Sequence, residues 1–311
     1  MSADHSLKGA AFAFAAFAAF SFSDASIKLL EGTLSPYETA FFGAVFGLFA
    51  LPFLIKKGDQ WSDVVRSTNR PLWLIRFVCA AVSAIGSVVA FTHLSMPEAF
   101  ALIFLLPSFV TIMSVIFLKE VVGIRRWSAV LIGFIGVLVV LRPGFRELSI
   151  GHLGAVAGGF GGAVSIVIFR AMGPKEKNIS LYGAGVFGWM SITGLLMIPG
   201  FVWPTSEQWL YLAAFGLLAA LANVLLMRAA TFVEAGIIGS IQYSQMLWAI
   251  LLGTLVFGDS VDMPTWAGIV LVVGSGFLTL MRERKRGTPL PPSVAATDTQ
   301  AAVAVKPDDE S

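Results

Sequence analysis

The apolar residues of this chain form ten blocks of about 20 residues, and this pattern restricts its fold more than any other feature. An α-helix of that length crosses the hydrocarbon core of a membrane, which is about 30 Å thick. Only 13% of the 311 residues are charged, compared with about 25% in a soluble domain, and the charges gather between the blocks. We therefore predict an all-α integral membrane protein with ten transmembrane helices, surrounded by a lipid bilayer.

The ten predicted spans are separated mostly by short loops. A cleaved signal peptide is disfavoured, because the first apolar run continues through Asp24 and Lys28 to Leu30 and is long enough to span. Residues 287–311 are rich in Pro, Ala, Thr and Asp and predict a disordered cytoplasmic tail. The spans cover residues 9–30, 37–55, 71–93, 97–118, 124–141, 151–171, 180–202, 208–229, 234–257 and 264–281.

The distribution of lysine and arginine predicts the orientation of the spans. Positive residues favour the cytoplasmic side, and the loops of one side hold only Arg142 and Arg146. Arg76 lies near a cytoplasmic helix end, where we expect its side chain to snorkel to the membrane surface. Both termini are therefore predicted to be cytoplasmic, in a bacterial inner membrane. The positive residues of the predicted cytoplasmic segments are Lys8, Lys56, Lys57, Arg66, Arg70, Lys119, Arg125, Arg126, Lys175, Lys177, Arg282, Arg284, Lys285 and Arg286.

An internal repeat is visible at the end of each half of the chain. Glu120 and Trp127 stand at the same spacing as Asp259 and Trp266, and a glycine-containing apolar block follows each pair. A block of five spans that starts on one side of the membrane ends on the other, so its copy must run in the opposite orientation. This arrangement favours alternating access around a central site. The predicted domains are residues 9–142 and 151–282, two inverted five-helix repeats.

Charged residues inside a span are costly and often functional. Asp24 and Lys28 lie four residues apart on the first span and share one helix face. Two interpretations are open. The pair could lie in the transport pathway, with Asp24 binding a substrate amine or Lys28 a carboxylate. Alternatively, the two side chains could satisfy each other within the helix.

The densest polar cluster within a span lies on the ninth. Gln242, Tyr243, Gln245 and Trp248 combine amides with aromatic rings, and Asn223 is a similar polar residue on the eighth span. Amides orient a small amphipathic solute and rings stack on it, so these five residues are predicted to bind substrate. The alternative is that the amides only form hydrogen bonds between helices.

Two further residues are candidates for gating. His93 ends the third span and could gate the pathway or carry a proton, although an interfacial histidine is often structural. Pro107 lies midway along the fourth span and predicts a kink near the cavity. Met246 stands in the equivalent region of the ninth span, so we expect the two halves not to be equally kinked.

Three glutamates at predicted helix starts have the spacing of a capping box, in which hydroxyl and carboxylate satisfy free N–H groups. We expect them to cap helices rather than to carry protons. The segments 95–99 and 231–235 are also expected to be counterparts in the repeat. The predicted pairs are Ser35 with Glu38, Ser95 with Glu98, and Thr231 with Glu234.

The repeat pattern resembles the EamA-type family of the drug/metabolite transporter superfamily. The resemblance covers about residues 9–282 and is carried by the two acids, the two tryptophans, the glycines of each last helix, Lys28 and Pro107. It implies ten helices in inverted repeats, a cavity lined mainly by spans 1, 3, 4, 6, 8 and 9, and no cofactor. Within the superfamily the chain is similar to amino-acid exporters, including aromatic amino-acid exporters.

We therefore expect a secondary transporter, not an enzyme, that exports small metabolites. Amino acids are the main expectation. The first alternative is a transporter of another small solute (a nucleobase, a vitamin or an organic cation). A channel or an intramembrane enzyme ranks below it. One cysteine, Cys79, and three scattered histidines predict no metal site and no disulfide. Dispersed positive charge predicts no nucleic-acid partner. The expected state is a monomer or a weak homo-oligomer.

Overall fold

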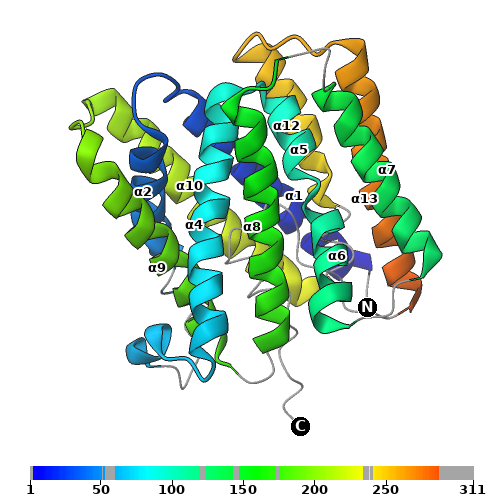
Figure 1. Cartoon of the computed structure of the whole chain (residues 1–311), viewed down its shortest axis with the longest axis horizontal. Coiled ribbons are helices and arrows are strands. Elements are labelled where there is room, and N and C mark those ends of the chain that lie inside the picture. Colours follow the sequence, from blue (N-terminus) through cyan, green and yellow to red (C-terminus); the bar gives the residue numbers. More distant parts are fainter. Residues whose placement is uncertain are drawn as a thin grey trace.

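The computed structural model describes residues 3–50, 52, 60–119, 123–142, 147–172, 176–233, 238 and 241–286. Within these ranges a helix covers each of the ten predicted spans, which confirms the all-α prediction (Figure 1). Glu120, Glu234 and the predicted tail 287–311 lie outside the described residues. The α-helices are α1 (Ala3–Lys28), α2 (Pro36–Gly47), α4 (Arg70–His93), α5 (Met96–Ile103), α6 (Leu106–Leu118), α7 (Ile124–Leu141), α8 (Ile150–Met172), α9 (Asn178–Met197), α10 (Ser206–Phe232), α12 (Ser244–Leu255) and α13 (Met263–Arg286), and the 3₁₀ helices are η1 (Leu48–Ala50), η2 (Trp61–Val65) and η3 (Ile198–Gly200).

The outer surface of the bundle is apolar, as a lipid environment requires. On α7, Leu131, Ile135 and Leu138 recur at helical spacing, and each is more than half exposed. Among the described residues, six helical segments are long and apolar enough to cross a membrane, and three more contain shorter apolar stretches. Exposed leucine and isoleucine stripes are unfavourable in water but favourable against hydrocarbon, so lipid is the solvent of this surface.

The main helix contacts between the two repeats are made twice, by equivalent pairs of helices. α4 lies along α8, and α1 lies along α10, and these are the two most extensive helix contacts. In the repeat, α1 corresponds to α8 and α4 to α10, so the same contact between repeats is made twice. Figure 1 shows α7 beside α13 at one edge of the bundle and α2 with α9 at the other.

The ends of α4 and α10 fix the register of the repeat. The Leu94 N–H donates to Ala90 O (2.9 Å) after α4, and the Val233 N–H donates to Ala229 O (3.0 Å) after α10. Leu94 and Val233 have the same separation along the chain as the two tryptophans of the repeat motif. This shared separation is the register used below.

This register corrects one expected correspondence. Thr231 lies in the last turn of α10, where Thr92 lies in the last turn of α4, so it does not begin a helix. The predicted capping role of Thr231 and the pairing of segment 231–235 with 95–99 are therefore wrong. The sequence similarity of the two segments is out of register by a few residues.

Both repeats break a helix at the same place. The chain turns at Phe104 and Leu105 between α5 and α6, immediately before Pro107 in the first turn of α6. It also turns at Tyr243 before α12, and Tyr243 is the counterpart of Phe104 in the register. Unequal kinks were expected because proline is present only in the first half, but the second half breaks at the equivalent residue without a proline. The rings of Phe104 and Tyr243 meet with centroids 5.7 Å apart, so the two breaks touch at the centre of the bundle.

The first capping box is confirmed, and the second is not formed. Glu38 N–H donates to Ser35 Oγ and Ser35 N–H donates to the Glu38 carboxylate, both at 3.2 Å. Ser95 makes no side-chain cap, and Glu98 bonds instead to His152. The spacing alone does not distinguish a cap from a carboxylate that finds a partner on another helix.

Arg76 does not snorkel. Its side chain is fully buried, and it donates to Leu181 O (2.8 Å) and Ser165 O (2.6 Å). A guanidinium has five donors, so it can join α4 to α8 and α9 through backbone carbonyls while it stays charged. The predicted surface position is wrong, because the helix end on which Arg76 lies is covered by the other repeat.

Glycine lets α4 and α8 approach closely. A Cβ on Gly86 would lie 2.5 Å from Gly154 O and 2.7 Å from Gly158 N, which are backbone atoms that cannot move aside. This is the close approach that the G-x-x-x-G spacing of Gly154 and Gly158 permits.

Replacing Gly86 tests this packing. We expect Gly86→Ala to lower the free energy of unfolding by about 1–3 kcal/mol, because the added methyl group overpacks the helix interface. Gly47→Ala is the matched control, since a Cβ there has no atom within 4 Å. Thermal unfolding of the detergent-purified proteins measures both. Equal midpoints for the two variants would contradict the close contact.

Candidate functional site

A cavity of about 100 Å³ lies among α1, α4, α5, α8, α9 and α10. Its walls include Phe20–Ile27 of α1 and Ala80–Phe91 of α4, which are the halves of these helices nearest Lys28 and Leu94. We call this end of the bundle the Lys28 end and the opposite end, where α4 begins, the Arg76 end. The cavity therefore lies between the middle of the bundle and the Lys28 end. It has room for about three water molecules, so it must widen to accept a larger solute.

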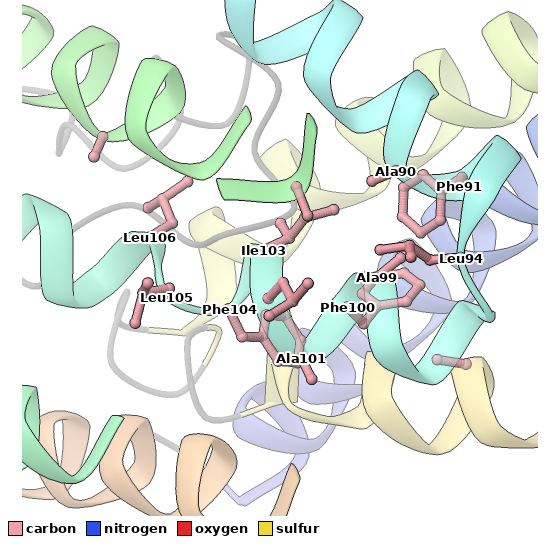
Figure 2. Packing of buried hydrophobic residues seen from close by; sticks show 14 of the residues in the cluster. Ala90, Phe91, Leu94, Ala99, Phe100, Ala101, Ile103, Phe104, Leu105 and Leu106 are labelled. Carbon is pink, nitrogen blue, oxygen red and sulfur yellow. The ribbon is translucent and has the colours of Figure 1, made fainter. Parts of the chain in front are cut away.

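The cavity wall is mainly aromatic with a few hydroxyl groups. Figure 2 shows the corner between α4 and α5 from which Phe91, Phe100 and Phe104 arise. The ring pairs Phe91–Phe100 and Phe100–Phe104 have centroids 5.1 and 5.9 Å apart and are tilted by 60° and 58°, so this part of the wall is a row of contacting rings. The remaining aromatic and polar residues of the wall are Phe20, Trp189, Phe215, Ser23, Ser83 and Ser87.

Asp24 is the acidic residue of this wall. Its carboxylate has no hydrogen-bond or ion-pair partner among the described residues, although the rest of the protein surrounds it. A carboxylate at this depth normally requires a counter-ion or water. Of the predicted substrate-binding residues, Asp24 alone is among the residues found to line the cavity.

Trp189 adds an unpaired donor to the same cavity. Its indole Nε1 is buried and has no hydrogen-bond partner, and its ring packs on Phe215 at 6.3 Å. Ser23 donates its hydroxyl to Phe215 O (2.7 Å), which holds α1 against α10 beside this ring. The Asp24 carboxylate, an acceptor, and the Trp189 Nε1–H, a donor, thus lie in the wall of the same small cavity.

Lys28 does not pair with Asp24. Its Nζ lies 2.9 Å from both carboxylate oxygens of Asp259 and donates to Leu94 O at 3.2 Å. Both side chains are largely buried, with exposed fractions of 8% and 13%. The intrahelical interpretation of the Asp24–Lys28 spacing is therefore wrong, and Asp24 is left without its predicted neighbour.

The Lys28–Asp259 pair joins the two repeats at the Lys28 end. Asp259 also accepts the Met96 N–H (3.0 Å), and the Phe257 ring centroid lies 5.1 Å from the ammonium. One ion pair thus ties the end of α1, the corner between α4 and α5, and the loop after α12. It lies one helical turn beyond Asp24, between the cavity and this end of the bundle.

A second buried pair lies nearby. Ser149 N–H donates to His152 Nδ1 (2.9 Å), so the ring proton is on Nε2, which donates to Glu98 Oε1 (3.0 Å). Both side chains are about 5% exposed, and they come from different repeats. A backbone amide therefore fixes the tautomer that connects α8 to α5.

The Lys28 end also has a polar surface pocket of about 330 Å³. Its wall includes His93, which is itself exposed and contacts Val89 O through Nδ1 (3.0 Å). Arg142 pairs with Asp262 there at 2.7 Å. The Thr265 hydroxyl, together with Arg142, holds the pKa of Asp262 below its usual range. His93 is thus at a solvent-facing pocket rather than in the central cavity.

The amides of the eighth and ninth spans are buried away from the cavity wall. Gln245 is fully buried with neither amide atom bonded, and Gln242 Nε2 and Asn223 Oδ1 also lack partners. Tyr243 contacts Phe104, and Trp248 packs on rings of α1 with its Nε1 unbonded. The expectation that the ninth span lines the cavity is therefore not met in this conformation. Trp189 of helix α9, which is the seventh predicted span, lines the cavity instead.

Sequence reasoning missed Trp189, the wall serines and Asp259 as the partner of Lys28. Asp259 was identified as part of the repeat, but no local signal relates it to a lysine of the first span. Trp189 lies in a uniformly apolar span, where nothing distinguishes it from a lipid-facing tryptophan. Pro107 follows the break at Phe104, which lines the cavity, but Pro107 itself is not among the residues found in the cavity wall.

Comparisons with known proteins agree on a family. The sequence profile of the EamA-like transporter family matches residues 7–142 and 149–281. The S-adenosylmethionine uptake transporter of Rickettsia bellii is 23% identical, covering 85% of this chain and 90% of its own length. The pseudopaline exporter of Pseudomonas aeruginosa is 26% identical, over 83% and 92%.

Two further comparisons extend this result. A riboflavin transporter of Rhizobium johnstonii is 27% identical, over 77% of this chain and 78% of its own. A solved crystal structure aligns with a TM-score of 0.57 and 15% identity, covering 93% of this chain and 100% of the other, which shows a shared fold.

The buried ion pair can be tested by a double-mutant cycle. We expect Lys28→Met and Asp259→Asn each to lower the free energy of unfolding by about 3 kcal/mol, because each leaves a buried charge unpaired. The double variant should lose clearly less than the sum. The exposed pair Arg142–Asp262 is the control and should contribute about 1 kcal/mol or less. Denaturant unfolding in detergent measures the cycle, and additive losses would argue against the pair.

Proposed function

The chain belongs to the EamA-like transporter family, and from this we propose that it carries a small solute with a positively charged group by alternating access through the Asp24 cavity. The observation that carries the proposal is the Asp24 carboxylate, which has no partner among the described residues and faces an apolar cavity with six aromatic residues in its wall. An ammonium or sulfonium group would supply the missing counter-charge, and the rings would hold its apolar part by stacking and cation–π contact.

The closed ends of the cavity support a carrier rather than a continuous pore. At the Lys28 end the Lys28–Asp259 pair lies between the cavity and the end of the bundle. At the Arg76 end, Glu176 accepts bonds from Ser67 and Thr68, and Lys177 pairs with Asp63. These contacts join the two repeats, so opening either end requires the repeats to move relative to each other.

The orientation follows from the lysine and arginine distribution. We propose that both termini are cytoplasmic and that the Lys28 end faces outward. The two arginines predicted on that side are in one loop, and the described one, Arg142, is neutralised by Asp262.

Cysteine labelling tests this orientation: Ser206→Cys, on a Cys79→Ser background, should react with an impermeant thiol reagent from outside only.

The substrate class remains broader than the amino acids expected from sequence. The relatives described above are named as transporters of S-adenosylmethionine, pseudopaline and riboflavin. Neutral amino acids have the ammonium group that Asp24 would bind, and aromatic ones also fit the rings. We therefore propose two candidate substrate classes: neutral amino acids, which are zwitterions with an ammonium group, and small organic cations.

A liposome screen tests transport. We expect saturable, counter-exchanging flux of at least one of labelled phenylalanine, threonine, methionine and S-adenosylmethionine, with riboflavin as an uncharged comparison. The screen is run with and without a pH gradient. Flux that does not saturate would indicate a channel, and no flux of any of the four compounds with an ammonium or sulfonium group would reject the proposal.

Asp24→Asn tests the role of the carboxylate. The change keeps the shape but removes the charge, so the transport efficiency for the cationic substrate should fall about tenfold to a hundredfold, the value of a charged hydrogen bond. Glu207→Asn, at an exposed position, is the control for loss of one negative charge. An Asp24→Asn protein that folds and transports normally would remove Asp24 from the site.

A further inference from the structure

Three buried amides of the second repeat have polar atoms without a partner. The exposed fractions of Asn223, Gln242 and Gln245 are 4%, 4% and 0%. Among the described residues, Asn223 Oδ1, Gln242 Nε2 and both amide atoms of Gln245 have no hydrogen-bond partner. Unsatisfied amides are rare in protein interiors and less favourable still within a membrane, so four such atoms on neighbouring helices need a physical reason.

The register of the repeat provides one. The counterpart of Asn223 is Ala84 and that of Gln242 is Ile103, because each pair has the same separation as Leu94 and Val233. Ala84 and Ile103 both line the observed cavity. The two amides therefore occupy, in the second repeat, positions that form the cavity wall in the first.

The equivalent space in the second repeat is closed in this conformation. Ala13 and Phe17 of α1 belong to one apolar cluster with Leu226 and Ala229 of α10, at the half of the bundle nearest the Arg76 end. Two inverted repeats can exchange conformations, and the exchange converts a cavity near one end into its counterpart near the other. The counterpart cavity would open where this cluster is now packed.

We infer that Asn223 and Gln242, supported by Gln245, form the substrate-binding wall of the opposite-facing state. The inference rests on the proposed alternating access. In that state the amides gain the partners they lack here, from water or from substrate. The free atoms are two carbonyl oxygens, which accept, and two amide nitrogens, which donate, so the matching ligand group both donates and accepts hydrogen bonds, as a carboxamide does. The solute class is then one that has such a group in addition to its positive charge.

Cysteine accessibility in full-length protein in liposomes tests the inference. Asn223→Cys and Gln242→Cys are made on the Cys79→Ser background and exposed to an impermeant methanethiosulfonate reagent from each side. Ala84→Cys reports the observed cavity, and Ala249→Cys, fully buried on α12, is the negative control. Each variant is also combined with Asp63→Asn and Glu176→Gln, which weaken the contacts at the Arg76 end.

We expect Asn223→Cys and Gln242→Cys to react from the Arg76 end only, and roughly fivefold faster when these contacts are weakened. Ala84→Cys should react from the Lys28 end and become slower in the same background, while Ala249→Cys stays unreactive. If Ala84→Cys behaves so but both amide positions stay unreactive, the inference is overturned and the carrier proposal stands. If Ala84→Cys reacts equally from both sides in both backgrounds, alternating access itself fails. Size-exclusion profiles identify misfolded variants. If one of the two amide variants misfolds, the other still tests the inference.

Discussion

The structure depends on one constraint: inside hydrocarbon, every polar group must find its partner within the protein. The constraint makes each span helical and leaves leucine and isoleucine on the outside. It also decides where a helix can break. The turns at Phe104 and Tyr243 expose backbone groups, and they lie against each other at the centre, where protein rather than lipid surrounds them. The break points, and so the cavity beside Phe104, are in the one region that tolerates irregular backbone.

The same constraint separates structural from functional polar groups. Lys28, Arg76 and His152 are all buried, and each is bonded to a group of the opposite repeat. These bonds stabilise the present arrangement of the repeats. Among the described residues, the half-buried Asp24 and the fully buried Gln245 lack such partners, and a stable membrane protein has little reason to keep them unless something else binds there. The groups that violate the rule are therefore the informative ones.

The sequence predicted what depends on local or one-dimensional properties. Span length and hydropathy predicted the helices, and the Ser35–Glu38 box formed because both partners are on one turn. It could not predict the partner of Lys28, because Asp24 is four residues away whereas Asp259 is 231 residues away, and only the fold brings the latter close. Arg76 was assigned to the surface for the same reason, since the helix that covers it belongs to the other half. The break at Tyr243 was missed because no proline marks it.

The two repeats are alike in backbone but differ in the side chains at equivalent wall positions, where the first has Ala84 and Ile103 and the second has Asn223 and Gln242. A solute would therefore meet an aromatic, acidic wall in one state and an amide wall in the other, and its affinity would differ between the two sides of the membrane. A ligand shifts a two-state equilibrium only by its difference in affinity for the states. Over a complete cycle these differences cancel, so unequal walls alter the half-saturation concentration on each side but leave the direction of net flux to the gradients.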